Sequence, residues 1–285
     1  DEGTGQAQRA PLMKGLRLIR IVLAVLFFTA SVVYFAVGHK AFPAAGVAER
    51  AQIIPSAIAV GMGAILFWII ISLLLGRVYC STVCPVGTFQ DILISLRRRI
   101  PGLNRPYRYR HARQTRYHVL AVYVVCLIAG VTAVPYWIEP WNIMRNICSV
   151  FNPTVAEATW LNLGVGMAVG IGSGIVSALL IGVCAFFTGR GFCTDICPVG
   201  TALGSLHNLT LFHIEIDPDK CVGCMKCEEV CRSQCVKVVG RYVDNSRCVR
   251  CFDCLAVCKD DAIHFQMNRN RRGTPLLRKV GKQQV

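Results

Sequence analysis

Eight cysteines in the C-terminal part of the chain are spaced like the ligands of iron–sulfur clusters. The pattern Cys-x2-Cys-x2-Cys-x3-Cys occurs twice between residues 221 and 258. Where two such runs carry two [4Fe-4S] clusters, the first three cysteines of a run bind one cluster and the fourth binds the other. We therefore predict two clusters, the first bound by Cys221, Cys224, Cys227 and Cys258, and the second by Cys248, Cys251, Cys254 and Cys231.

The residues before each run repeat as well. Ile-Asp-x-x-Lys-Cys at 216–221 returns as Val-Asp-x-x-Arg-Cys at 243–248, which is 27 residues later, and this indicates a duplicated half-domain. The alternatives are a zinc site or a disulfide framework. Zinc needs only four ligands per site at looser spacings, and disulfides would not require this periodicity. Arg232 and Lys259 follow the fourth cysteines, and a cation there favours the more negative reduced cluster.

A second cysteine motif occurs in the apolar part of the chain. Cys-x3-Cys-Pro-Val-Gly-Thr stands at 80–88 and returns at 193–201, an offset of 113 residues. Cysteines four apart share a helical face, and proline suits the first turn of a following helix. We expect the four thiols to meet at one membrane face, where they hold an additional iron–sulfur cluster or cycle through disulfides. Packing of helix ends is the alternative. The four residues are Cys80, Cys84, Cys193 and Cys197.

The rest of the chain has the composition of a membrane protein. Its mean hydropathy is +0.48, and 54% of its residues are hydrophobic while 16% are charged. Four apolar stretches come close to the length of about 20 helical residues that crosses a bilayer; they are residues 16–37, 56–75, 117–134 and 161–187. The first is longer than the apolar core of a secretory signal, about 7–15 residues, so we interpret it as a retained span.

The basic residues indicate the orientation of the spans. Thirteen lysines and arginines lie in the N-terminal flank and in residues 77–116, whereas the two opposite loops hold three. The positive-inside rule then predicts a multi-pass protein of the cytoplasmic (inner) membrane with both termini and the cluster region in the cytoplasm. A reducing cytosol keeps thiols free for metal. The net charge of +15 fits membrane lipid and an acidic redox partner better than nucleic acid.

Taken together, these features resemble one known family. Four spans, paired Cys-x3-Cys-Pro motifs and a C-terminal two-cluster module are similar to the NapH/MauN type of ferredoxin-like membrane proteins, over about residues 16–266. The resemblance implies a quinol dehydrogenase component, with quinol as substrate, that passes electrons from the quinone pool to other redox subunits. The alternative is a maturation factor that uses the same clusters to reduce metals or disulfides during enzyme assembly. The sequence does not separate these two roles.

The expected fold class is a membrane α-helical domain of four transmembrane helices followed by a small α+β two-cluster ferredoxin domain. The boundaries are a cytoplasmic tail at 1–15, the membrane domain at 16–212, the ferredoxin domain at 213–267 and a basic tail at 268–285. In the ferredoxin domain, residues 213–216 alternate like a strand, and the expected partner strands are residues 236–239 and 262–266.

A few further residues could belong to a redox site. His118, Glu139, Trp137 and Trp141 could line a quinone headgroup, but aromatic residues near span ends more often form the interfacial belt, which we favour.

The remaining cysteines and a glycine repeat have structural interpretations. Cys235 has no partner in the motif and is expected to be a spare thiol, and Cys126, Cys148 and Cys184 are expected to be small apolar residues. Gly166, Gly170 and Gly174 recur every four residues, which predicts close helix packing. The chain has no Cys-x-x-Cys-His motif for covalent haem and no nucleotide-binding fingerprint.

Overall fold

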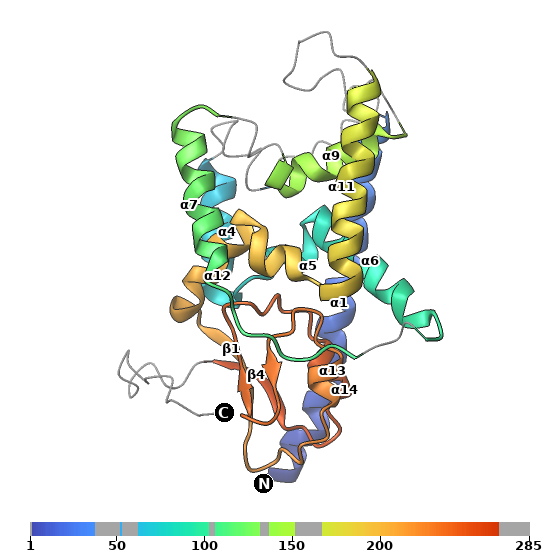
Figure 1. The fold of residues 1–285 in the computed structure, drawn as a ribbon. Helices are drawn as coiled ribbons and strands as arrows, with labels where there is room; N and C mark the ends of the chain where they lie inside the picture. The colour runs from blue at the N-terminus through green and yellow to red at the C-terminus, as the bar shows by residue number, and fades with distance from the viewer. Residues whose placement is uncertain are drawn as a thin grey trace.

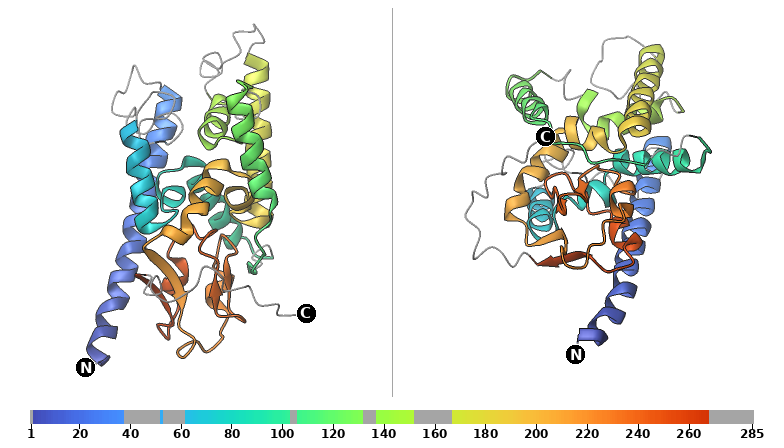
Figure 2. Two further views of the ribbon diagram at one scale, coloured as in Figure 1. Left: turned by 90° about the vertical axis from the view of Figure 1, so that its left-hand side faces the viewer. Right: turned by 60° about the horizontal axis from the view of Figure 1, so that its bottom comes forward.

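The computed structural model describes residues 2–37, 52, 62–102, 106–131, 137–151 and 167–267. Helices occupy one end of the molecule, and a small module with short strands occupies the other (Figures 1 and 2). The helical part comprises α1 (Glu2–Val37), α4 (Met62–Leu75), α5 (Tyr79–Thr82), α6 (Pro85–Arg99), α7 (Thr115–Ile128), α9 (Pro140–Ser149), α11 (Met167–Thr188), the π-helix η2 (Phe192–Ile196), α12 (Pro198–Ser205) and the 3-10 helix η3 (Leu206–Leu209). The basic tail at 268–285 lies outside the described residues.

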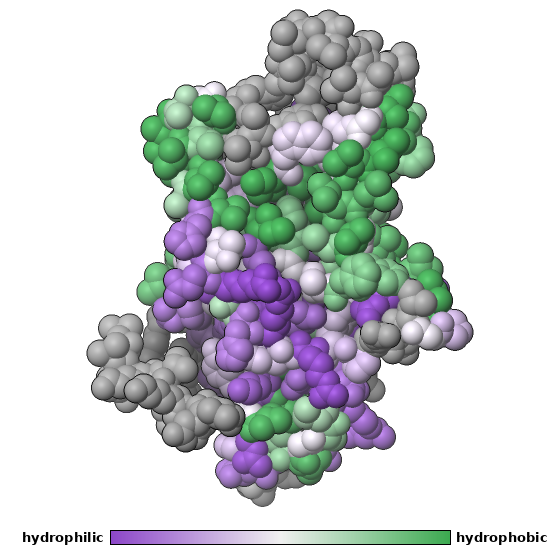
Figure 3. Space-filling model, in the orientation of Figure 1, coloured by the Kyte–Doolittle hydropathy of each residue, from purple (hydrophilic) through white to green (hydrophobic). Residues whose placement is uncertain are grey.

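Two of the described helices are long and apolar enough to cross a membrane. They are Gly15–Ala36 within α1 and Ile171–Thr188 within α11, and two shorter apolar helices are Leu66–Leu75 and Thr115–Ile128. Parts of the second and fourth predicted spans, residues 56–61 and 161–166, lie outside the described residues. Apolar side chains cover the helical end of the molecule, and polar side chains predominate on the module (Figure 3).

Helix α9 lies inside the helical part. Trp141 and Met144 of α9 are buried in the same apolar cluster as Phe35, Tyr79 and Ile181. The close approach of α9 to α11 requires glycine at position 174, because a Cβ there would lie 2.2 Å from the carbonyl oxygen of Asn146. Gly174 therefore has the close-packing role predicted for it, whereas Gly166 lies outside the described residues.

The module contains two small antiparallel sheets. Strand β1 (Phe212–Ile216) pairs with β4 (Ile263–Met267), and β2 (Val236–Lys237) pairs with β3 (Tyr242–Val243). The prediction that residues 236–239 pair with the first strand is therefore wrong. A turn closed by the bond from Arg241 N to the Val238 carbonyl oxygen, 2.9 Å, brings β3 back onto β2. Local pairing through a tight turn leaves β1 to the more distant β4.

The module is docked tightly on the helices. The guanidinium of Arg250 donates to the Leu75 carbonyl oxygen at 3.0 Å, and Leu211 N donates to the Leu73 carbonyl oxygen at 2.9 Å. These bonds satisfy the last carbonyl groups of α4, which no helical partner can reach. Gly76 follows in the left-handed region with φ of 79°, where a Cβ would meet Arg250. The end of an apolar helix is thus capped by the cysteine-rich module.

Candidate iron–sulfur sites

The eight ferredoxin-type cysteines line two separate cavities. Cys221, Cys224, Cys227 and Cys258 line one cavity, here called the outer site; Cys231, Cys248, Cys251 and Cys254 line the other, here called the inner site. Their empty volumes are about 350 and 320 Å³. These are the two sets that the motif spacing predicts, each with three cysteines from one run and the fourth from the other.

Repeated backbone turns shape both sites. Met225 and Phe252, which stand 27 residues apart, have φ of 64° and 61° and precede the short helices α13 (Lys226–Glu229) and α14 (Asp253–Val257). Gly223 and Arg250 form a second equivalent pair with positive φ. Left-handed conformations cost about 1–2 kcal/mol at residues other than glycine, so the fold maintains strained turns around the cysteines.

Backbone N–H groups point at the fourth cysteine of each run. Cys235 N donates to the Cys231 sulfur at 3.4 Å, and Ala262 N donates to the Cys258 sulfur at 3.3 Å. Residues 235 and 262 are again 27 apart. Such donors stabilise the thiolate form that iron requires and tune the potential of a cluster. The residues present therefore fit [4Fe-4S] clusters in both sites.

Cys235 belongs to the surroundings of the inner site, contrary to the expectation of a spare thiol. Its sulfur lies 3.5 Å from the Cys231 sulfur, and its side chain is buried. Hydrogen bonding from Cys235 and the charge of Arg250 outweigh the effect of burial and hold the pKa of Cys248 below its usual value. The motif alone could not identify this residue, because its position matters only after the chain folds back.

The four cysteines of the Cys-x3-Cys-Pro repeats converge. Cys80, Cys84, Cys193 and Cys197 are each 3–4% exposed and lie in one apolar cluster. Burial raises the pKa of Cys84, and the nearby thiols of Cys193 and Cys80 raise it further; the pKa of Cys197 is raised by burial and by the other three. All four thiols are free of disulfides. We call this group the membrane-face site.

The two cysteines of a repeat do not share one helix. Cys80 lies in α5, and Cys84 stands in extended conformation as the N-cap of α6, just before Pro85. In the second repeat, Cys193 lies in η2, and Cys197 is the N-cap of α12. Proline cannot continue the preceding helix, so the predicted restart at proline occurs in both repeats. The turn before it aims both thiols inward.

Two arginines link the repeats reciprocally. Arg77, from the first repeat, donates to the carbonyl oxygen of Cys193 at 2.6 Å, and Arg190, from the second, donates to the carbonyl oxygen of Cys80 at 2.6 Å. Gly87 and Gly200 allow this arrangement, because a Cβ at either position would lie 2.3 Å from the Cys80 or Cys193 carbonyl oxygen, respectively. The repeats are therefore arranged with approximate twofold symmetry about the membrane-face site.

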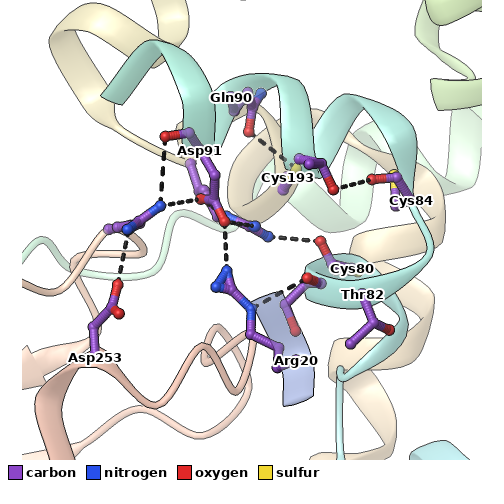
Figure 4. A network of polar contacts seen from close by, with 12 residues as sticks. Arg20, Cys80, Thr82, Cys84, Gln90, Asp91, Cys193 and Asp253 are labelled. Carbon is purple, nitrogen blue, oxygen red and sulfur yellow. Dashed lines mark hydrogen bonds and ion pairs between the residues drawn. The ribbon is translucent and has the colours of Figure 1, made fainter. Parts of the chain in front are cut away.

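A buried carboxylate stands beside this site (Figure 4). Asp91 of α6 forms ion pairs with Arg20 at 2.6 Å, Arg190 at 2.7 Å and Arg232 at 3.0 Å. Burial opposes its ionisation, but the three arginines outweigh burial and hold the pKa of Asp91 well below its usual range. Arg232 also pairs with Asp253 of the module at 2.9 Å. Its charge is thus shared with two carboxylates, while Lys259, the other cation after a fourth cysteine, is exposed.

The three cysteine sites follow one another through the molecule. Cys251 of the inner site packs against the apolar cluster that contains the membrane-face site. The charge of Arg190 acts on both Cys193 and Cys251. At the far side, Cys224 of the outer site is exposed. The inner site therefore lies between the buried membrane-face site and the exposed outer site.

The interfacial-belt interpretation is wrong for two of the residues considered for a quinone headgroup. Trp141 is buried and packs against Phe35 with ring centroids 4.7 Å apart. Glu139 is also buried; it accepts a hydrogen bond from Asn142 at 2.6 Å, and burial raises its pKa to about 7, against the opposing charge of Arg145. In contrast, Trp137 and His118 are exposed.

No group of three or more histidine, cysteine, aspartate or glutamate side chains in the described part of the chain is close enough to hold a single metal ion. A cubane spreads its four thiolates over four irons, so its ligands stand farther apart than those of one ion. The separation within each site is therefore compatible with a cluster rather than with a single zinc ion.

Comparison with known proteins is consistent with this geometry. A family model described as a 4Fe-4S binding domain matches residues 57–104 and 171–214, which contain the two Cys-x3-Cys-Pro motifs, and a second model of the same description matches residues 213–236. The ferredoxin-type protein NapH of Escherichia coli (strain K12) is 31% identical over 59% of this chain and 52% of its own length.

Two other relatives are similar over the same part of the chain. The methylamine utilization ferredoxin-type protein MauN of Paracoccus denitrificans (strain Pd 1222) is 28% identical, over 60% of this chain and 53% of its own length. YccM of Escherichia coli (strain K12) is 24% identical, over 64% and 48%. The chain thus spans about half the length of these relatives. No solved structure matches it. The resemblance to NapH/MauN-type ferredoxin-like proteins is confirmed, and the matches indicate [4Fe-4S] clusters.

Proposed function

We propose that this protein is a membrane-bound electron-transfer subunit that takes electrons from quinol and passes them to a redox partner. The observation that carries the proposal is the order of the three cysteine sites, from the buried membrane-face site through the inner site to the exposed Cys224. Iron–sulfur clusters bound at these sites would accept and release single electrons. The chain's part is to hold the thiolates in a row and to exclude water from the first two sites.

The surface of the helices supports four transmembrane spans. Each of α1, α4, α7 and α11 has large apolar side chains that face outward. Examples are Leu18 of α1, Phe67 of α4, Val125 of α7 and Leu179 of α11, which are 53–63% exposed. Such patches are costly in water but favourable in lipid. With the basic residues on one side, we propose that the module and both termini lie in the cytoplasm.

The membrane-face site has room for a further function of its polar neighbours. Gln90 is fully buried, and its carbonyl oxygen accepts a hydrogen bond from the Cys193 thiol at 3.2 Å. Its amide nitrogen has no partner among the described residues. A buried donor without a partner is unfavourable, and an anionic sulfur at this site would supply one. This arrangement supports an additional iron–sulfur cluster held by the four cysteines, in preference to disulfide cycling.

Glu139 is our proposed proton acceptor for quinol, which releases two protons with its two electrons. Its carboxylate is buried at the N-terminus of α9, the helix whose Trp141 and Met144 pack in the cluster with the membrane-face cysteines. A carboxyl group with a pKa of about 7 can exchange a proton near neutral pH.

The test is the double variant Cys84→Ser, Cys197→Ser in membranes. We expect quinol-dependent reduction of the module clusters to be lost, while dithionite still reduces them. The matched control is Cys148→Ser, because Cys148 is a buried thiol of the same apolar cluster outside both repeats. Unchanged quinol-dependent reduction in the double variant would refute the path through the membrane-face site. Failure of quinol to reduce even the wild-type clusters would favour the maturation-factor alternative.

A further inference from the structure

Arg77 is a buried cation beside the membrane-face site. It is 2% exposed, and its guanidinium donates to the carbonyl oxygens of Cys193 and Ser246, at 2.6 and 3.1 Å. Its Nε has no hydrogen-bond partner among the described residues, and none of the carboxylates in that part of the chain forms an ion pair with it. Arg77 thus retains an unbalanced positive charge in the interior.

The symmetry-related residue is in a different electrostatic position. Arg190 makes the equivalent bond to the Cys80 carbonyl oxygen, but it also binds Asp91 through two nitrogens, at 2.9 and 2.7 Å. Its charge is therefore balanced by a carboxylate of the protein. The two arginines match in geometry and differ in charge balance, so the repeat alone does not explain Arg77.

An unpaired buried charge is costly unless a charge of opposite sign is nearby. Carbonyl dipoles satisfy two N–H groups of Arg77, but they bring no net charge. The ionisable neighbour is Cys193, on which the charge of Arg77 acts directly. Neutral thiols would leave Arg77 unbalanced, whereas deprotonated cysteines around an anionic iron–sulfur group would balance it.

We propose that Arg77 is the positioning residue that supplies the counter-charge to the iron–sulfur group of the membrane-face site and raises its reduction potential. This inference rests on the proposed function, which places a cluster there. Reduction adds negative charge, and a fixed cation nearby stabilises the reduced form. Arg77 thereby makes the buried site a better acceptor for electrons from quinol.

The experiment compares Arg77→Gln, Arg77→Lys and Arg116→Gln by potentiometric titration followed by EPR. Gln removes the charge but keeps donors for a carbonyl oxygen, whereas Lys keeps the charge. Arg116 is the matched control, because it is 7% exposed and binds the side chain of the same Ser246 at 3.2 Å, but its other bond goes to Tyr117 rather than to a cysteine.

We expect Arg77→Gln to reduce the fraction of the membrane-face group in the reduced state about tenfold at fixed potential, a shift of about 59 mV for one electron. Arg77→Lys and Arg116→Gln should keep the wild-type value, and the inner and outer signals report correct folding. An unchanged potential in Arg77→Gln, or an equal fall in Arg77→Lys, overturns the inference alone. A wild-type protein with eight irons and no third signal overturns the proposed cluster and the inference with it.

Discussion

Replacing Asp91 by Asn should undock the cysteine module from the helices. The carboxylate contacts Arg20 and Arg190 of the helical part and Arg232 of the module, at 2.6–3.0 Å. At an effective dielectric constant of about 20, each contact has a gross Coulomb energy of about 6 kcal/mol, most of which offsets the desolvation of four ions. Removing one partner leaves three guanidinium groups uncompensated, which typically costs about 3–5 kcal/mol.

The loss should depend on pH in a defined direction. Because the pKa of Asp91 is depressed in the folded protein, its contribution to stability is present above the unfolded-state pKa of about 3.9 and is lost as the pH falls through the folded value. The difference between wild type and Asp91→Asn should therefore be constant from about pH 5 to 8 and should shrink only in more acidic solution.

The assay is denaturant unfolding in detergent, combined with hydrogen exchange of the module. A double-mutant cycle with Arg232→Gln isolates the contact between the two parts, for which we expect a coupling of about 0.5–3 kcal/mol. Arg99→Gln is the control, because Arg99 is exposed at the end of the same helix. A loss below about 1 kcal/mol for Asp91→Asn, or additive effects with Arg232→Gln, would refute the reasoning, since a surface ion pair contributes no more than that.

Three further predictions concern the cysteine sites. Cys221→Ser and Cys258→Ser should each remove the EPR signal of one cluster and about four irons per chain, while Cys248→Ser should remove the other signal; different signals lost from the first two variants would contradict the shared outer site. Cys235→Ala should leave the iron content unchanged but lower the potential of the inner cluster, because the ligand sulfurs lose a hydrogen-bond donor, and an unchanged titration would return Cys235 to a packing role. Gly200→Ala should destabilise the protein by about 1–3 kcal/mol, since its Cβ would lie 2.3 Å from the Cys193 carbonyl oxygen, whereas Gly182→Ala, with nothing within 4 Å, should be tolerated in the same thermal-unfolding measurement.

The sequence carried much of the site but little of its setting. Cluster ligands are readable because a cubane imposes short, regular spacings on the chain, so the grouping of Cys231 with Cys248 could be predicted. Convergence of Cys84 and Cys197 could be predicted from the repeat, since equivalent segments occupy equivalent positions. The breaks at Pro85 and Pro198 followed from proline chemistry.

Other features depend on tertiary contacts that leave no local pattern. Asp91 looks like an ordinary polar residue of an amphipathic helix, and only folding brings Arg20 and Arg232 to it. The inward position of α9 was missed because Trp141 near an apolar stretch has the composition of an interfacial residue. Val236–Lys237 was assigned to the wrong sheet because strand propensity does not specify a partner.

The exchange of arginine contacts between the repeats has a consequence for the origin of the chain. Arg77 reaches the Cys193 carbonyl oxygen and Arg190 reaches that of Cys80, which is the pattern of an isologous interface, in which each surface is its own complement. A half-length polypeptide with a single Cys-x3-Cys-Pro motif would have two thiols and an arginine without its acceptor, and it could complete both only with a second copy of itself. The present chain thus has the geometry of a homodimer fused end to end, and fusion made it possible for one half alone to acquire the carboxylate Asp91.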